Sequence, residues 1–153
     1  MMTEAYGSTE QMLGYYGTKD KPAAHFTFNF ELVNNLNPDN LNAYTVHQLV
    51  EGWLEIMDWR WSNWVIGNHD QHRVASRLGN TQLVDAWNAL VLLLPGTAVT
   101  YMGEELGMED GYVSWEDTDD PQACNGPVDG YEKRSRDPAR TPFQWDDSKN
   151  AGN

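Results

Sequence analysis

Apolar positions along residues 1–107 follow two alternating patterns, one typical of short buried strands and the other of helices. Runs rich in β-branched and aromatic residues predict strands at residues 2–6, 25–30, 63–67 and 97–102. Apolar residues at helical spacing predict helices at residues 9–16, 45–57 and 81–94, with an Asn-rich loop after residue 30. Because strand and helix alternate every 30 to 40 residues or so, the pattern predicts βαβ units with parallel strands, and therefore an α/β fold.

The periodicity ends after residue 107. Residues 108–153 contain Gly, Pro, Asp and Trp without regular spacing, which predicts a long irregular loop region. A closed (β/α)8 barrel needs about 250 residues, and four parallel strands alone would leave a sheet edge exposed. We therefore expect residues 1–153 to form part of a larger TIM barrel, about its last four βα units. In this division residues 1–107 are the βα repeats and residues 108–153 are the loops after the last strand.

Charge and composition narrow the choice of partners. The chain has 23 acidic and 10 basic residues and a net charge of −13, which disfavours binding to nucleic acid.

No apolar run approaches the roughly 20 residues that span a bilayer, and the first residues lack the basic start and apolar stretch of a secretion signal, so no membrane anchor is visible. The single cysteine, Cys124, cannot form an internal disulfide. The sequence by itself leaves the cellular location open.

Acidic or polar residues follow every predicted strand. They are Glu4, Asn29 and Glu31, Asn68 to Asp70, and Glu104 and Glu105. In a parallel barrel the carboxyl ends of the strands meet at one mouth, where active sites are built. The pattern therefore predicts that Glu4 and Asp70 face one cleft, and a pair of carboxylates across a cleft suits the hydrolysis of glycosidic bonds.

Two other interpretations of the segment around Asp70 stay open at this point. His69, Asp70 and His72 could hold a divalent cation, as in metal-dependent phosphohydrolases, although no second cluster of His or Asp completes the ligand set. Alternatively, Asp70 caps a following helix and His69 is an ordinary loop residue.

The loop region holds two further candidates. Arg140 lies between Pro138 and Pro142, which restrict the backbone, so its guanidinium could bind a carboxylate or a pair of sugar hydroxyls, or make ordinary surface ion pairs. The acidic stretch at residues 114–120 suits a calcium-binding loop or a solvated turn, and we favour the turn.

Several segments, in this order, resemble the α-amylase superfamily of glycoside hydrolases, glycoside hydrolase family 13, and most closely the insect maltases, which are α-glucosidases. They are residues 2–6 (MTEAY), 64–70 (WVIGNHD), 96–108, 111–118 (GYVSWEDT), 120–125 (DPQACN) and 135–146. Each is short, but the collinear set covers nearly the whole chain.

The resemblance implies a role for four residues. Glu4 would be the general acid/base, and Asp70 would bind the hydroxyls of the terminal glucose and stabilise the transition state. His69 would donate to the same sugar, and Arg140 would line or brace its pocket. The family needs no metal or other cofactor for the reaction, although a structural calcium fits the complete enzyme.

The nucleophile of the family is an Asp in a Gly-Phe-Arg-x-Asp-Ala-like segment, and this sequence contains no such segment. We therefore expect these residues alone to be inactive, and the complete enzyme to release terminal α-1,4-linked glucose from maltose-like oligosaccharides with retention. Whether maltose, sucrose or a similar small oligosaccharide is its preferred substrate stays open at this point. An alternative within the resemblance is the non-catalytic ectodomain of an amino-acid transporter heavy chain. Either would place the protein outside the cell, secreted or anchored in a membrane.

Overall fold

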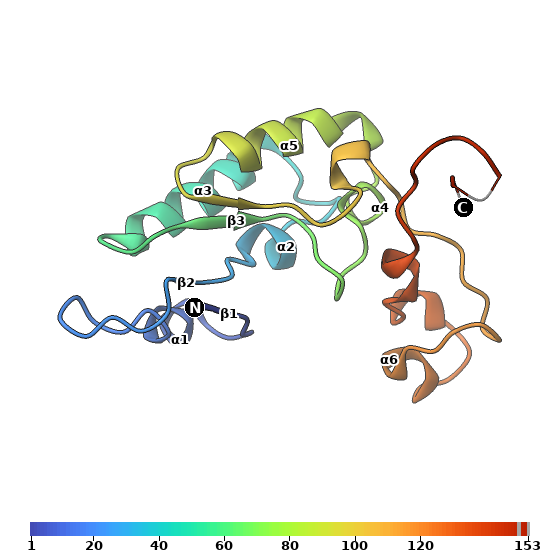
Figure 1. Cartoon of the computed structure of the whole chain (residues 1–153), viewed down its shortest axis with the longest axis horizontal. Coiled ribbons are helices and arrows are strands. Elements are labelled where there is room, and N and C mark those ends of the chain that lie inside the picture. The colour runs from blue at the N-terminus through green and yellow to red at the C-terminus, as the bar shows by residue number, and fades with distance from the viewer. Residues whose placement is uncertain (150, 153) are drawn as a thin grey trace. The chain divides into compact units, whose positions relative to one another are not determined.

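The computed structural model describes residues 1–149, 151 and 152, and within them it has the alternating strands and helices of an α/β protein (Figure 1). The strands are β1 (Met2–Thr3), β2 (Phe26–Thr27), β3 (Asn63–Val65) and β4 (Thr97–Val99). The helices are α1 (Thr9–Gly14), α2 (Glu31–Asn35), α3 (Ala43–Met57), α4 (Val74–Arg77), α5 (Val84–Leu93) and α6 (Pro121–Cys124), and the 3-10 turns are η1 (Thr81–Leu83), η2 (Glu104–Leu106), η3 (Tyr131–Lys133) and η4 (Asp137–Arg140). In this described part no helix is long and apolar enough to cross a membrane.

The chain divides into two compact units. Unit 1 contains residues 1–66 and 86–100, and unit 2 contains residues 67–85 and 101 onward. Unit 1 therefore holds all four strands with α1, α2, α3 and most of α5, whereas unit 2 holds α4, α6 and most of the loop region.

Side-chain caps fix where the helices of unit 1 begin. Ser8 forms a capping box with Gln11 at the start of α1, and Asn42 accepts a hydrogen bond from the Thr45 amide at the start of α3. After α5, Gly96 has a φ of 133°, and a Cβ there would collide with the backbone of Ser62. Glycine therefore permits the turn that leads from α5 into β4.

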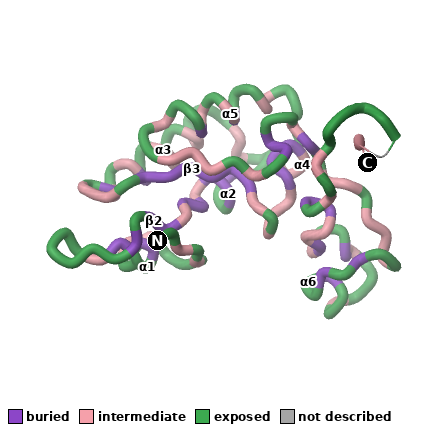
Figure 2. The backbone as a smooth tube through the Cα atoms, viewed as in Figure 1, coloured by how far each residue is buried: buried purple, intermediate pink, exposed green. Residues whose placement is uncertain are grey.

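The strands of unit 1 pair in parallel, as predicted. β1 pairs with β2, and β3 pairs with β4 in the register Trp64 to Ala98. Figure 2 shows continuous burial along β3, and its residue Val65 packs with Phe30 and Val33 in an apolar core. Burial on both faces is what a parallel strand requires.

Two buried asparagines join β2 to β3. Asn63 Oδ1 accepts from the Asn29 amide at 2.9 Å, and Asn63 Nδ2 donates to the Thr27 carbonyl at 2.7 Å. Asn29 Nδ2 donates in turn to the Asn63 carbonyl at 3.2 Å. Because unsatisfied polar groups are costly when buried, this reciprocal set holds the two strands at one register. Asn29, predicted as a polar strand-end residue, therefore has a structural role.

The predicted helices and strands are present, with shorter strands than the pattern indicated. The Asn-rich loop after residue 30 contains the short helix α2, and α4 was not predicted because four residues show no periodicity. The region after residue 107 is irregular, with α6, η3 and η4 as its only helical turns in the described part. Asn150 and Asn153, which belong to this predicted loop, lie outside the described residues.

Candidate functional site

Asp70 is the centre of a charged cluster in unit 2. The Asn68 side-chain oxygen accepts a hydrogen bond from the Asp70 amide at 2.9 Å, which stabilises the turn that follows β3. Asp70 Oδ1 receives two guanidinium hydrogen bonds, from Arg136 Nη1 at 2.9 Å and from Arg140 Nη2 at 3.0 Å. The other oxygen, Oδ2, lies 3.7 Å from His69 Nε2, too far for a hydrogen bond. Among the described residues, Asp70 thus keeps one carboxylate oxygen available to accept from a ligand hydroxyl.

Arg140 connects Asp70 with the backbone of His69. Its Nε donates to the His69 carbonyl at 2.8 Å while its Nη2 reaches Asp70, and the residue remains exposed. The structure therefore brings together three of the four predicted site residues, His69, Asp70 and Arg140. Asp70 does not cap α4, because the residue at that cap is Arg73 and the Asp70 carboxylate binds the two arginines instead.

A second carboxylate, that of Asp120, binds Nε and Nη2 of Arg136, whereas Asp70 binds Nη1. The Asp120 side chain is completely buried, and it accepts from Arg136 Nη2 at 2.6 Å, from Arg136 Nε at 3.0 Å and from the Arg136 amide at 2.6 Å. The Arg136 guanidinium holds the pKa of the Asp120 carboxyl well below its usual range, so the pair stays charged.

A polar cavity of about 360 Å³ lies beside this cluster within unit 2. Its walls include Asp70, Gln71, Gln122 and Arg136. Hydrogen-bonding groups of this kind suit a hydroxyl-rich ligand better than an apolar one.

The histidine three residues beyond His69 has a different partner. His72 Nδ1 lies 2.6 Å from Asp110 Oδ2, and this hydrogen bond raises the pKa of His72. The Asp110 carboxylate also accepts from the Arg73 amide at 2.8 Å. Within residues 1–149, 151 and 152 there is no group of three His, Cys, Asp or Glu side chains placed to hold a metal ion.

The acidic stretch at residues 114–120 is held by hydrogen bonds within itself and to Asp137. The Ser114 hydroxyl donates to Asp117 at 2.8 Å, and the backbone amides of Asp119 and Asp120 donate to Asp137 at 2.9 and 3.0 Å. Asp120, predicted as one of several acids in a turn, is instead the buried partner of Arg136.

Glu104, one of the two predicted strand-end acids after β4, is buried in unit 2. It accepts the Tyr101 amide at 2.9 Å, and a Cβ at Gly67 would collide with its carboxylate. Burial raises the pKa of Glu104 to about 7, against the opposing charges of Arg77 and Arg73. The neighbouring Glu105 is exposed and accepts the Gly103 amide at 3.0 Å.

This burial makes the stability of the protein depend on pH. The folded state keeps Glu104 protonated up to about pH 7, whereas the unfolded chain releases that proton near pH 4.5, the ordinary pKa of a glutamate. The stability that the protonated Glu104 side chain contributes to the fold is therefore fully present below pH 4.5, and it is lost as the pH rises through about 7. Glu104→Gln, which cannot ionise, should raise the free energy of unfolding at pH 8 by about 1–3 kcal/mol, with a much smaller gain at pH 5.

Urea unfolding at the two pH values measures this difference, in a longer protein that contains these 153 residues. Glu105→Gln is the matched control, because Glu105 is exposed, and it should change the free energy of unfolding little at either pH. A gain for Glu104→Gln that is the same at pH 5 and pH 8 would contradict the raised pKa.

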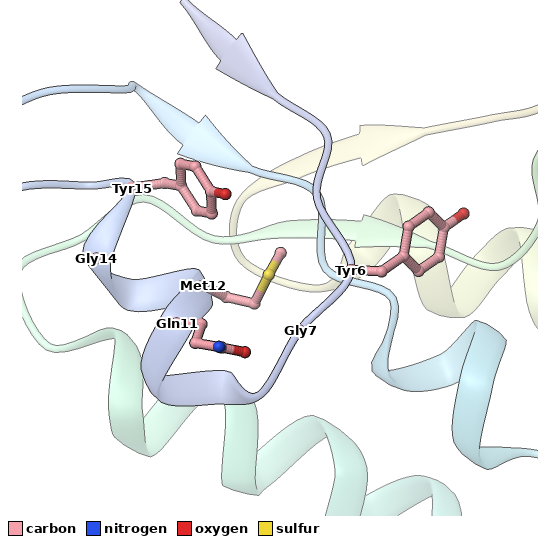
Figure 3. A pocket seen from close by; sticks show the side chains of 6 residues that line it. All are labelled: Tyr6, Gly7, Gln11, Met12, Gly14 and Tyr15. Carbon is pink, nitrogen blue, oxygen red and sulfur yellow. The ribbon is translucent and has the colours of Figure 1, made fainter.

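Glu4 lies in unit 1, where it follows β1 directly and is exposed. A hollow of about 360 Å³ lies in the same unit, and Tyr6, two residues after Glu4, is one of the residues that line it. Figure 3 shows the residues that line it, with the aromatic rings of Tyr6 and Tyr15 and the Met12 side chain among them. The structure thus places Glu4 at the carboxyl end of its strand, and its juxtaposition with Asp70 stays a prediction.

The sequence interpretation missed Arg136 as a member of the cluster. Arg136 lies in a matched segment, but its partners Asp120 and Asp70 are 16 and 66 residues away, and irregular loops carry no periodicity that would reveal such contacts. A partial signal existed at Asp120, because Asp before Pro121 is typical of a helix start, and Asp120 does cap α6.

Comparison with known proteins gives concordant matches along the whole chain. A family model described as the catalytic domain of alpha amylase matches residues 1–153. Maltase A1 of Drosophila melanogaster is 49% identical over 99% of the chain, and an alpha-glucosidase of Apis mellifera is 46% identical over 99%. An amino acid transporter heavy chain of Rattus norvegicus is 36% identical over 95%.

The chain is short beside these relatives. It spans 26% of the length of each of the two insect proteins and 19% of the heavy chain. Among solved structures, an alpha-glucosyl transfer enzyme matches 99% of the chain with a TM-score of 0.80 and 28% identity, and the match covers 28% of that enzyme.

Proposed function

Because this chain belongs to the family of α-amylase catalytic domains, we propose that it forms the second half of a catalytic (β/α)8 barrel that acts as an α-glucosidase. In this proposal residues 1–107 supply about the last four βα units, and residues 108–153 supply the loops after the last strand. The observation that carries it is the match to Maltase A1 over 99% of the chain at 49% identity. The parallel pairing of β1 with β2 and of β3 with β4 agrees with a barrel wall.

The proposed reaction is the hydrolysis of terminal α-1,4-linked glucose from a maltose-like oligosaccharide, with retention, and sucrose, whose glucose is held by an α-1,2 bond, is a further candidate substrate. Glu4 gives its proton to the glycosidic oxygen as that oxygen leaves, while a nucleophilic carboxylate attacks the anomeric carbon. Glu4 then takes a proton from the water that releases glucose from the enzyme. The nucleophile comes from a segment outside these 153 residues, and no metal or other cofactor takes part.

Asp70 binds the sugar in this proposal. Its Oδ1 is occupied by Arg136 and Arg140, so its Oδ2 accepts a hydroxyl hydrogen of the terminal glucose. As positive charge develops on the sugar ring, the Asp70 carboxylate stabilises the transition state. His69 is exposed beside Asp70 and donates to the same sugar, and Arg140 braces both residues.

The test needs the complete domain, by which we mean Maltase A1 with these 153 residues in place of its matching segment. The complete domain should hydrolyse maltose, and proton NMR should show α-glucose as the first product. The 153-residue chain alone should have no measurable activity on an aryl α-glucoside and should tend to aggregate, because an unfinished barrel exposes sheet edges. First release of β-glucose would contradict retention, and turnover by the isolated chain would contradict an external nucleophile.

The match to the transporter heavy chain supports a second candidate, a non-catalytic ectodomain. A complete domain that folds and binds maltose but does not hydrolyse it would favour that candidate. Unmodified Maltase A1, assayed in parallel, is the control for assay conditions.

A further inference from the structure

Arg136 links a buried anchor to the carboxylate that is proposed to bind the sugar. Asp120, the anchor, has no exposed side-chain surface, and its Oδ1 also accepts the Gln122 amide at 3.1 Å. The Asp120 backbone is held in turn, because its amide donates to Asp137 at 3.0 Å. Asp120 is therefore fixed by contacts that do not involve Asp70.

Because the Arg136 guanidinium is bound to the fixed Asp120 carboxylate, its own orientation is fixed as well. Arg136 uses Nε and Nη2 on Asp120, which leaves Nη1 for Asp70 Oδ1 at 2.9 Å. A guanidinium is planar and rigid, so two of its nitrogens held on one carboxylate set the direction of the third. The side chain of Arg136 is 21% exposed, which limits the freedom of the group further.

Arg140 is a weaker candidate for fixing the position of Asp70. It touches the same oxygen at 3.0 Å, but it is exposed and its other hydrogen bond goes to a single backbone carbonyl. Of the two arginines on Asp70, Arg136 is the one held by a buried carboxylate.

We propose that Arg136, anchored by Asp120, is a positioning residue that holds Asp70 Oδ1 and so directs Asp70 Oδ2 toward the sugar. The inference rests on the proposed function of Asp70. It deepens that function by assigning the orientation of the carboxylate to Arg136 and to its buried partner Asp120. The alternative is that the Asp120 and Arg136 pair only ties residues 119–120 to residues 136–137.

Arg136→Lys in the complete domain separates the two roles. Lysine keeps the charge, but its single nitrogen cannot make a two-nitrogen contact with Asp120 that sets the direction of a third nitrogen toward Asp70, so Asp70 would lose its fixed direction. We expect kcat for maltose to fall about 10²-fold, because small displacements of a positioned group cost about that much. KM should change less than kcat, since the Asp70 contact strengthens in the transition state.

The decisive measurement repeats Arg136→Lys in an Asp70→Asn background, with α-glucosyl fluoride as an activated substrate. If Arg136 acts through Asp70, the double variant should be within about threefold of Asp70→Asn alone, because coupled residues are not additive. If Arg136 only ties the loops together, its effect should be the same in both backgrounds, and that result would overturn the inference.

Two further variants keep the test interpretable. Arg60→Lys is the control for an arginine outside the site, because the Arg60 guanidinium lies over the Trp59 ring in unit 1 and does not line this cavity, and its kcat should stay within about twofold of wild type. If Arg136→Lys fails to fold, Asp120→Asn replaces it, because the amide oxygen keeps an acceptor for Gln122 while the amide nitrogen takes the place of Oδ2, the oxygen that accepts from the Arg136 amide and Nε.

The outcomes distinguish this inference from the proposed function. An inactive complete domain, or an Asp70→Asn variant with wild-type turnover, would contradict the function itself. An Asp70→Asn variant that is impaired while Arg136→Lys and Asp120→Asn are not would overturn only the role of Arg136.

Discussion

Asp70→Asn in the complete domain is expected to lower kcat/KM about 10²- to 10³-fold, both for maltose and for an aryl α-glucoside. Asparagine has almost the same shape as aspartate but lacks its charge, so it can no longer stabilise positive charge on the sugar. Because this stabilisation acts on the ring and not on the departing group, both substrates should lose activity to a similar extent.

Steady-state kinetics with the two substrates measures the effect. Asp39→Asn is the matched control, because Asp39 is an exposed loop residue of unit 1, and it should leave kcat/KM within about twofold. A loss confined to maltose would instead assign Asp70 to leaving-group chemistry, and an unchanged kcat/KM would remove it from the site.

The fold could be predicted where the burial of a helix or strand gives its apolar residues a regular spacing along the sequence. The helical spacing in residues 45–57 reflects the buried face of α3, which includes Trp53 and Met57. The run at residues 63–67 reflects β3, which is buried on both faces. By contrast, α4 and α6 have four residues each, too few to show a period. Ser76 of α4 accepts from the Asp110 amide, and Asp120 at the start of α6 accepts from the Arg136 amide, both in distant loops.

The site could be predicted only where it follows a strand or repeats a family segment. Asp70 was predicted on both grounds, and Arg140 on its prolines and its segment. Arg136 and its buried partner Asp120 were not, because a contact between two irregular segments leaves no trace in local pattern or propensity. The charged cluster also explains why so acidic a chain keeps arginines here, since Asp70 and Asp120 together bind the two guanidinium groups.

Glu4→Gln should separate the acid/base role from sugar binding, because it affects only steps that move a proton. For maltose, whose leaving glucose must be protonated, kcat/KM should fall about 10²- to 10⁴-fold. The phenol of an activated aryl α-glucoside is acidic enough to leave without being protonated by Glu4. The glycosylation step for that substrate should therefore change much less. Presteady-state release of the phenol measures that step directly, and Glu10→Gln, an exposed glutamate at the start of α1, is the control.

The second half of the reaction gives an independent check on Glu4. Without a general base, water attacks the glycosyl-enzyme slowly, so the aryl substrate should show a burst of phenol followed by slow turnover. Azide needs no deprotonation to act as a nucleophile, and it should therefore restore turnover of Glu4→Gln with formation of α-glucosyl azide, whereas it should not rescue Asp70→Asn. Equal slowing of glycosylation for good and poor leaving groups, without rescue by azide, would mean that Glu4 is not the acid/base and that the likeness of residues 2–6 to the family segment is coincidental.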